Sequence, residues 1–351
     1  MTMPTVLFAW RRTPPPLLIG GAEVSQQLLA EEFAAEGWTV AYLGSYETPW
    51  NGENELPALR AYLAAHQVPY AEHHQEVRYT WNGVHCRAVP QTMVHSALAA
   101  ALAELKPDLL ITSQEGAADV TAQARRVTQV AAWLHSVSPT SLNVLYGRPH
   151  TALAVSRFVL ARARPQHGTR PVLLHPPFAK PKPKPKPSSG PSGDGILMIN
   201  PVPQKGAALL HQLLEHLPEQ PFTLVEGWWD TSGDFARYPH VTYVRRTYDM
   251  NVLYESHRLL LVPSTVEDAF PRVVIEAGLH RLPSLGADHG GIPEAIGDGG
   301  LLLPRDAGVQ KWAAAIEASA DPLLGARARE HALPFTRPCL PELAQAGVIP
   351  P

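Results

Sequence analysis

The sequence predicts an α/β protein made of two Rossmann-like domains, and three observations lead to this fold class. Short apolar segments alternate with amphipathic ones along most of the chain. The chain has 351 residues, more than one hydrophobic core usually serves. A stretch rich in Lys, Pro, Ser and Gly interrupts the alternation near the middle of the sequence. Alternating strands and helices indicate parallel sheets that are covered on both faces.

The interrupting stretch is the predicted linker between the domains. From Lys180 to Lys186 it alternates Lys and Pro, which favours an extended polyproline II spacer, and a Ser/Gly-rich piece follows. The alternative interpretation is a basic patch for anionic lipid, but four lysines are at the low edge of what that needs. We therefore expect an N-terminal domain over 1–178, the linker over 179–195, a C-terminal domain over 196–325, and a tail over 326–351 that crosses back to the N-terminal domain.

In the N-terminal domain the clearest local signal is a hairpin. Apolar and polar residues alternate from Val77 to Val89 around Asn82-Gly83, a pair typical of a tight hairpin turn. A helical face that contains Val24 ends at Gly37, a residue suited to a helix C-terminus. The other elements expected here are strands over 6–9, 39–43, 109–111 and 130–134 and a helix over 98–105.

The C-terminal domain shows the alternation more cleanly. Leucines at helical spacing between 209 and 217 mark one amphipathic helix. In this type of fold, ligands bind beyond the carboxyl ends of the strands. The remaining elements expected here are strands over 196–199, 222–225, 241–244, 259–262 and 301–303 and helices over 250–257, 270–279 and 313–320.

Composition excludes several classes of protein. The formal net charge of −3 argues against a nucleic-acid binder, which is normally basic over a whole domain. No apolar segment approaches the roughly 20 residues needed to span a bilayer, and the N-terminus lacks a signal-peptide layout. We therefore expect a cytoplasmic protein, with peripheral contact at the inner face of the membrane left open. Cys86 and Cys339 are too few for a disulfide framework or a Cys-rich metal site.

The segment from Pro263 to Pro304 is the richest in residues that could carry chemistry. An acidic turn with Asp268 precedes a helix that opens near Pro271, and proline suits the first helical position. The N–H groups of a first helical turn favour a phosphate or a sugar hydroxyl. Glu276 lies further along this helix, where a carboxylate can accept hydrogen bonds from a ribose diol. On spacing alone, Asp268 as a helix cap and Glu276 as a solvated residue remain the simpler interpretation.

With Gly290-Gly291-Ile292-Pro293-Glu294 following, this segment resembles the family 4 glycosyltransferases, which are retaining enzymes of the GT-B fold. The family has Pro-Ser, then Glu-x7-Glu enclosing Phe-Gly, then Gly-Gly-Ile-Pro-Glu. The resemblance implies two Rossmann-like domains with parallel sheets that face a central cleft. It also implies that Glu276 holds the donor ribose and that Asp268, Ala269 and Phe270 face the donor sugar. Asp268 stands where the family has Glu, and Pro271, which has no N–H, stands where it has Gly.

Two further segments match family positions that face the donor. Lys205-Gly206 stands at a helix start, where a lysine can neutralise a diphosphate, although an exposed turn lysine is an equal alternative. The family has Gly-Arg before this lysine, whereas this chain has Asn200-Pro201; Arg245 or Arg246 is the candidate replacement. Gly20-Gly21 precede the first helix, as a simple turn or, as the resemblance implies, as a loop at the diphosphate and the acceptor.

His135 follows a buried strand, a place where a lone histidine is usually structural. The resemblance makes it the candidate for the reacting sugar on the N-terminal domain. The sequence contains no Asp-x-Asp pair, and clustered carboxylates are what Mg²⁺ or Mn²⁺ usually needs to hold a nucleotide sugar. We therefore expect no metal and no cofactor, with the nucleotide sugar as co-substrate.

Together the resemblance predicts a retaining, metal-independent glycosyltransferase, a hexosyltransferase or a related enzyme, acting in polysaccharide biosynthesis. Its partners would be a nucleotide-diphosphate sugar and a glycan, glycolipid or other hydroxyl acceptor, including a lipid-linked one. One alternative is a nucleotide-sugar epimerase of the same fold. The other is a non-catalytic homologue that binds a nucleotide or glycan; Asp268, Pro271 and the missing Arg favour it, and Glu276 and Lys205 oppose it.

Overall fold

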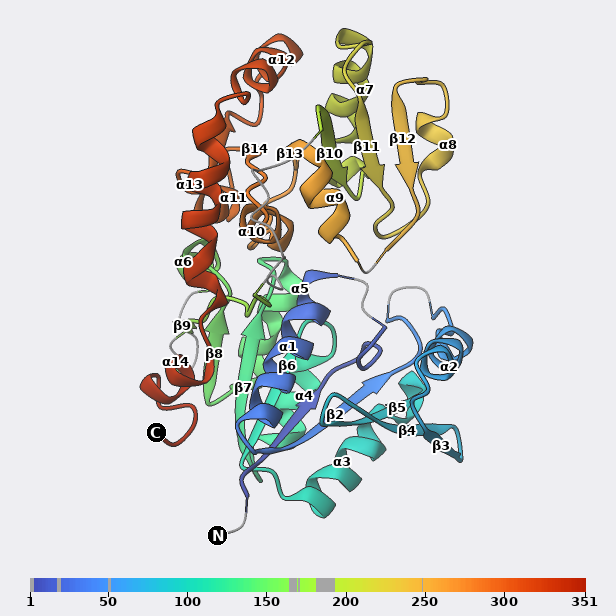
Figure 1. Cartoon of the computed structure of the whole chain (residues 1–351). Helices are drawn as coiled ribbons and strands as arrows, with labels where there is room; N and C mark the ends of the chain where they lie inside the picture. The colour runs from blue at the N-terminus through green and yellow to red at the C-terminus, as the bar shows by residue number, and fades with distance from the viewer. Residues whose placement is uncertain are drawn as a thin grey trace. The chain divides into compact units, whose positions relative to one another are not determined.

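The computed structural model describes residues 3–17, 20–49, 52–163, 169, 171–180, 193–247 and 249–351. The linker predicted over 179–195 lies mainly outside these ranges. The chain divides into two compact units, which are described separately (Figure 1). Unit 1 comprises 1–177 and 338–351, and unit 2 comprises 178–337. Cys86 and Cys339 are both buried, and neither forms a disulfide within the described ranges.

In the described part of unit 1, nine strands form one sheet in the order β3-β4-β5-β2-β1-β6-β7-β8-β9. All neighbouring pairs are parallel except those of β4, which is antiparallel to both β3 and β5. The strands are β1 (Thr5–Ala9), β2 (Thr39–Ser45), β3 (Tyr70–His73), β4 (Glu76–Trp81), β5 (Val84–Val89), β6 (Leu109–Ser113), β7 (Gln129–Leu134), β8 (Thr151–Ala154) and β9 (Pro171–Leu173).

Helices cover both faces of the central strands of this sheet. On one face Phe33 of α1 packs on Phe8, and Phe8 stacks on Tyr42. On the other face α3 and α4 pack on Leu7 and Leu43 in one hydrophobic cluster. Burial on both faces explains why these strands read as short apolar segments. The helices are α1 (Gly21–Ala35), α2 (Leu56–Ala65), α3 (Val94–Leu105), α4 (Ala117–Ala124), α5 (Pro139–Leu142), α6 (Arg157–Arg162) and α14 (Leu340–Gln345), with 3₁₀ turns at Gln91–Met93 and Asn143–Gly147.

The predicted hairpin and helix end are both confirmed. Strands β4 and β5 pair antiparallel, and Asn82 and Gly83 both have positive φ, 47° and 82°. Helix α1 ends at Ala35, and Gly37 follows with φ 84°. Short elements without a strong periodic signal, such as β3 and α5, are additional to those expected from the sequence.

The described residues of unit 2 form a parallel sheet of six strands in the order β12-β11-β10-β13-β14-β15. Figure 1 shows helices on both sides of it. The strands are β10 (Gly195–Ile199), β11 (Phe222–Val225), β12 (Val241–Val244), β13 (His257–Val262), β14 (Ser284–Ala287) and β15 (Gly300–Leu303). The helices are α7 (Ala207–His216), α8 (Ser232–Phe235), α9 (Asn251–Ser256), α10 (Arg272–Leu279), α11 (Ile292–Ile296), α12 (Val309–Ala318) and α13 (Pro322–Ala332), with 3₁₀ turns at Pro203–Lys205 and Leu333–Thr336.

The boundary of unit 2 lies further along the chain than residue 325. Helix α13 packs closely on α10: a Cβ atom added to Gly278 would lie 2.8 Å from the carbonyl oxygen of Ala328. Because this contact ties α13 to the unit, the division falls after Arg337. The last residues, 338–351, belong to unit 1, where the Leu340 N–H donates to the Glu32 carboxylate at 2.8 Å.

Candidate functional site

In unit 2, the carboxyl ends of three neighbouring strands bring together residues far apart in sequence. Lys205 follows β10, Trp228 follows β11, and Asp268 follows β13, and β10 pairs in parallel with both other strands. The Lys205 ammonium forms an ion pair with the Asp268 carboxylate, and it also lies 5.7 Å from the centroid of the Trp228 ring. This is the edge of the sheet where a doubly wound fold binds its ligands.

Asp268 is held from several directions. The Ser264 hydroxyl donates to its carboxylate at 2.6 Å, and the Gly291 N–H donates to its backbone carbonyl at 2.6 Å. The neighbouring His289 ring lies 2.7 Å from the Ser264 carbonyl oxygen. Gly291 lies close against the backbone of the loop that carries Asp268. A Cβ atom on Gly291 would lie 2.0 Å from the Ala269 carbonyl oxygen. Glycine allows this contact, and the result is a carboxylate fixed beside a lysine.

Glu276 lies on α10 and is already engaged on both carboxylate oxygens. The Tyr254 hydroxyl donates to one oxygen at 3.0 Å, and Arg272 donates to the other at 3.2 Å. Burial raises the pKa of Tyr254 well above its usual value, and the negative charge of Glu276 adds to this effect. The Tyr254 hydroxyl therefore stays protonated and remains a donor. The Glu276 side chain remains 31% exposed, which leaves part of the carboxylate accessible.

Phe270 and Pro271 differ from the expected arrangement in detail. The Phe270 ring is buried beside Phe178 and Phe335, with centroids 6.3 and 5.3 Å away, so its side chain belongs to the core. Pro271 is the N-cap of α10, and the helix begins at Arg272, two residues later than the predicted range of 270–279. With φ −71° and ψ 100°, Pro271 has the extended backbone typical of a cap.

Gly206 determines where Lys205 lies. It has φ 95°, a conformation that L side chains rarely adopt, and it is the N-cap of α7. A Cβ atom there would lie 2.2 Å from the Pro263 carbonyl oxygen, which belongs to the loop after β13. The glycine thus lets the loop that carries Lys205 approach the loop that carries Asp268.

Replacing Gly206 by alanine is expected to lower the free energy of unfolding by about 1–3 kcal/mol, because the new methyl group meets backbone that cannot rotate away. Urea denaturation measures the effect. Gly233→Ala is the matched control in the same unit, since a Cβ atom there meets nothing within 4 Å. Equal stability of the two variants would contradict this account of the close approach.

The two arginines considered as replacements for the missing family Arg have other partners. Arg245 pairs with Glu226 at 2.9 Å and with Asp230 at 2.5 Å. Arg246 donates to the carbonyl oxygens of Gly227 and Trp228 at 2.5 and 3.2 Å. Both therefore fix the loop after β11. Asn200, at the position of the family Gly, is buried with φ 60° and accepts the Trp228 N–H at 3.1 Å.

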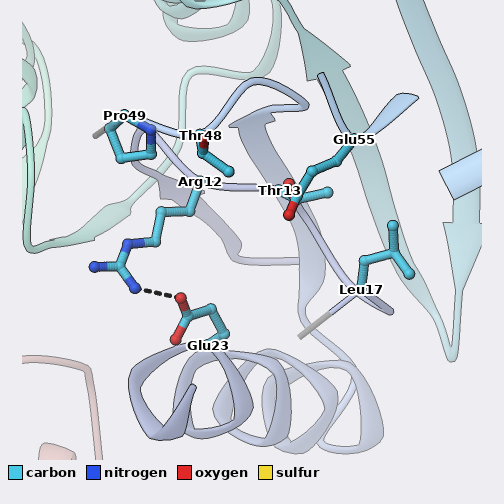
Figure 2. A pocket seen from close by; sticks show the side chains of 7 residues that line it. All are labelled: Arg12, Thr13, Leu17, Glu23, Thr48, Pro49 and Glu55. Atoms are coloured by element: carbon cyan, nitrogen blue, oxygen red, sulfur yellow. Dashed lines mark hydrogen bonds and ion pairs between the residues drawn. The ribbon is translucent and has the colours of Figure 1, made fainter. Parts of the chain in front are cut away.

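In unit 1, the carboxyl ends of the strands carry a cluster centred on Arg12 (Figure 2). Arg12 follows β1 and pairs with Glu23 in the first turn of α1. Its guanidinium also donates to both carboxylate oxygens of Glu115, which follows β6, at 2.9–3.1 Å. Burial alone would lower the pKa of Arg12, but the two carboxylates outweigh it and raise the pKa, so the guanidinium is permanently charged.

A small cavity of about 10 Å³ lies beside this cluster, close to the volume of a single water probe. Glu23 is buried, and its second carboxylate oxygen has no hydrogen-bond partner among the described residues. Figure 2 shows Glu23 and Arg12 turned toward each other at this cavity. The residues that line it are Arg12, Thr13, Leu17, Glu23, Thr48, Pro49 and Glu55.

The other predicted residues of unit 1 lie at the same edge of the sheet. Gly20 is the N-cap of α1, with Gly21 as the first helical residue. A Cβ atom on Gly20 would lie 3.0 Å from the Glu23 carboxylate, so the glycine leaves room for the Arg12 cluster. His135 directly follows β7, half-buried, with its ring 4.5 Å from that of Trp133.

A larger hollow of about 560 Å³ lies elsewhere on unit 1. Its lining combines apolar residues of β1, β2 and α3, such as Leu43 and Leu105, with the polar outer residues Arg78, Thr80 and His85 of β4 and β5. It lies on a face of the sheet rather than at the carboxyl ends of its strands, and none of the predicted site residues lines it.

Sequence reasoning missed several residues of these two clusters. Ser264 stands in the Pro-Ser of the family motif, but the sequence assigned no partner to its side chain. Tyr254 lies in an otherwise ordinary segment, and no spacing marks it as a partner of Glu276. Arg12 and Trp228 had a usable signal: each lies in the loop after a strand of an α/β unit, where such folds place their ligand-binding residues.

Comparison with known proteins finds a family model that matches part of unit 2 and solved structures that share the fold of the whole chain. Residues 199–321 match the family described as "Glycosyl transferases group 1". This range contains Lys205, Asp268, Glu276 and the Gly290-Gly291 motif. No curated protein matches the chain in sequence.

Solved structures resemble the chain over nearly its full length. Anabaena HepE in complex with UDP-glucose has a TM-score of 0.71 at 18% identity, covering 97% of this chain and 99% of that one. WaaG, a glycosyltransferase involved in lipopolysaccharide biosynthesis, has 0.67 at 16%, covering 99% and 100%. A variant of S. aureus TarM, in complex with fondaparinux, α-GlcNAc-glycerol and UDP, has 0.67 at 10%, covering 99% of both chains. The likeness confirms the predicted fold class, GT-B with two Rossmann-like units.

Proposed function

We propose that the chain transfers a sugar from a nucleotide-diphosphate sugar to a hydroxyl acceptor, with retention at the anomeric carbon and without a metal ion. The observation that carries the proposal is the contact of Lys205 with Asp268 at the carboxyl ends of β10 and β13, in a unit that matches group 1 glycosyltransferases. A fixed cation beside a fixed carboxylate suits a donor that has an anionic diphosphate next to a hydroxyl-rich sugar.

Each donor group has a candidate partner in unit 2. Lys205 would bind the diphosphate, Asp268 and the Ala269–Phe270 backbone would receive the sugar, and Glu276 would accept hydrogen bonds from the ribose. In the transfer, the bond from the anomeric carbon to the diphosphate oxygen breaks, and the nucleoside diphosphate leaves. A bond to the acceptor oxygen forms on the same face, and the proton of the acceptor hydroxyl passes to the departing diphosphate oxygen. The protein contributes orientation and charge stabilisation.

The acceptor would bind at the Arg12 cluster and His135 of unit 1. HepE was solved with UDP-glucose, and the TarM variant with UDP and glycan-like ligands. WaaG is involved in lipopolysaccharide biosynthesis. These relatives support a UDP-linked donor and an acceptor that is a glycan or glycolipid, in the synthesis of a cell-surface polysaccharide. No helix in the described ranges is long and apolar enough to cross a membrane.

The test is release of nucleoside diphosphate from UDP-glucose, GDP-mannose, ADP-glucose and dTDP-glucose, with EDTA present throughout. Slow hydrolysis of one donor that depends on Lys205 is the expected result. Binding of a nucleotide without turnover of any donor, with or without added glycan acceptors or Mg²⁺, would favour a second candidate, a non-catalytic nucleotide-binding homologue. Two observations motivate that candidate: Pro271 offers no N–H at the cap of α10, and Arg245 and Arg246 are engaged with the loop after β11.

The variant Glu276→Gln is expected to weaken nucleoside diphosphate binding about 10- to 100-fold, since hydrogen bonds to a charged acceptor are worth roughly 1.5–3 kcal/mol. Titration calorimetry measures the affinity. The amide keeps the size of the side chain, but its single oxygen cannot accept from both Tyr254 and Arg272, and the nearly buried Arg272 loses its counter-charge. Thermal unfolding is therefore measured as well, and affinities are compared at a temperature where both proteins are folded. Glu317→Gln, at an exposed position of α12, is the control. Unchanged affinity in Glu276→Gln would remove Glu276 from the site.

A further inference from the structure

The loop after β11 presents two exposed tryptophans. Trp228 and Trp229 are 43% and 47% exposed, and no other tryptophan in the described ranges is exposed to this degree. Their ring centroids are 5.9 Å apart. A soluble surface rarely shows such rings without a partner, because each has a large apolar area to bury.

Hydrogen bonds hold the loop at several points along its length. The Trp228 N–H donates to Asn200, and its carbonyl accepts from Arg246. The Glu226 N–H donates to the Val244 carbonyl at 2.9 Å, and the Thr231 N–H donates to the Tyr243 hydroxyl at 3.0 Å. Hydrogen bonds on both sides of the two tryptophans favour a preorganised surface, which loses little conformational entropy when a ligand binds.

Gly227 makes this arrangement possible. A Cβ atom at Gly227 would lie 2.3 Å from the side-chain carbonyl carbon of Asn200, so only glycine allows the two loops to approach this closely. The contact places the Trp228 ring on the side of Lys205, with 5.7 Å between the ammonium and the ring centroid. The Trp228 ring and Lys205, the residue proposed to bind the diphosphate, thus lie at the same edge of one sheet.

We propose that Trp228 is a stacking surface for a ring of the donor, and so a residue that sets donor affinity and specificity. This rests on the proposed function. A nucleotide-diphosphate sugar carries a ring on each side of its diphosphate, the base with its ribose and the transferred sugar. A ligand anchored by its diphosphate at Lys205 therefore has a ring within reach of the indole. Stacking on an aromatic side chain adds affinity and tolerates different rings, because each has an apolar face.

The test compares Trp228→Ala and Trp228→Phe with the wild-type protein. Calorimetry measures binding of UDP, UDP-glucose and inorganic pyrophosphate, and of the corresponding GDP, ADP or dTDP compounds if one of these binds best. Trp228→Ala is expected to weaken nucleotide binding about 5- to 100-fold, the range given by stacking energies. Trp228→Phe retains a ring and should stay within about threefold of wild type. Pyrophosphate has no ring, so its affinity should not change.

The pattern of affinity losses in Trp228→Ala shows whether the base or the sugar of the donor stacks on the indole. Equal losses for UDP and UDP-glucose assign Trp228 to the base, whereas a loss for UDP-glucose alone assigns it to the sugar. Trp229 is similarly exposed, but no lysine lies at its ring in the described structure. Trp229→Ala should therefore lose less nucleotide affinity than Trp228→Ala. Fluorescence is a second readout: the nucleotide should quench the emission of wild type more than that of Trp228→Phe.

Two outcomes would overturn the inference while leaving the proposed function intact. One is equal nucleotide affinity of Trp228→Ala and wild type. The other is an equal loss of nucleotide and pyrophosphate affinity, which would mean that the substitution acts through Lys205. If wild type itself binds none of the nucleotides, the proposed function fails, and the inference fails with it.

Discussion

Replacing Lys205 by methionine is expected to lower kcat for donor cleavage about 10²- to 10³-fold, the usual cost of removing one group that stabilises developing charge. As the diphosphate leaves, it gains negative charge, and in the proposed mechanism the Lys205 ammonium is the cation that stabilises this charge. Asp268 would then lie beside the diphosphate without its counter-charge, which adds repulsion. Methionine has a similar length and no charge, so packing should change little.

Steady-state release of nucleoside diphosphate at saturating donor measures this effect. Lys311→Met, at an exposed position on α12 of the same unit, is the matched control and should keep wild-type kcat. Lys205→Arg should recover part of the activity, because it restores the charge but with a different geometry. If Lys205→Met retained wild-type kcat, the diphosphate would have to bind elsewhere.

Replacing Arg12 by methionine is expected to lower the free energy of unfolding by about 3–5 kcal/mol, the range for removing one partner of a buried ion pair. The Glu23 side chain is only 3% exposed, and one of its oxygens already lacks a hydrogen-bond partner among the described residues. Without the guanidinium, a buried carboxylate would lose the counter-charge that faces it. Glu115 would lose the same partner and with it the tie between β1 and the loop after β6.

Urea denaturation of the full chain measures the loss. Arg11→Met is the control next in sequence: Arg11 lies 3.6 Å from Asp119, which is 62% exposed, and such pairs are worth at most about 1 kcal/mol. The double variant Arg12→Met with Glu23→Gln should recover part of the lost stability, since no buried charge is then left alone. A loss as small as that of Arg11→Met would show that the cluster is solvated.

Hydrophobic alternation was sufficient to predict most of the fold. Strands such as β6 and β13 are buried on both faces and read as short apolar segments, and turn residues such as Asn82-Gly83 act locally. The end of unit 2 was not predictable in this way. Its position depends on the packing of α13 on α10, a contact between segments about 50 residues apart, and α13 has no strong apolar stripe.

The candidate site was predictable where its residues lie in a recognisable motif. Lys205, Asp268 and Glu276 each stand in such a segment, although their roles remain predictions. The contacts around them were not predictable, because they depend on how the loops fold. Ser264 becomes a partner of Asp268 only because the loop after β13 folds back, and Asn200 is the support for Trp228 only because Gly227 allows close approach.

Calorimetric titration of the wild-type protein with UDP, GDP, ADP and dTDP in EDTA shows whether unit 2 binds a nucleotide-sugar donor. We expect one of these nucleotides to bind without a metal ion and Lys205→Met to weaken its binding at least tenfold. We also expect the same nucleotide, at a hundredfold excess over its dissociation constant, to stabilise the protein by about 2.7 kcal/mol. If none of the four binds, with or without Mg²⁺, unit 2 has no donor site and the chain is not a nucleotide-sugar transferase.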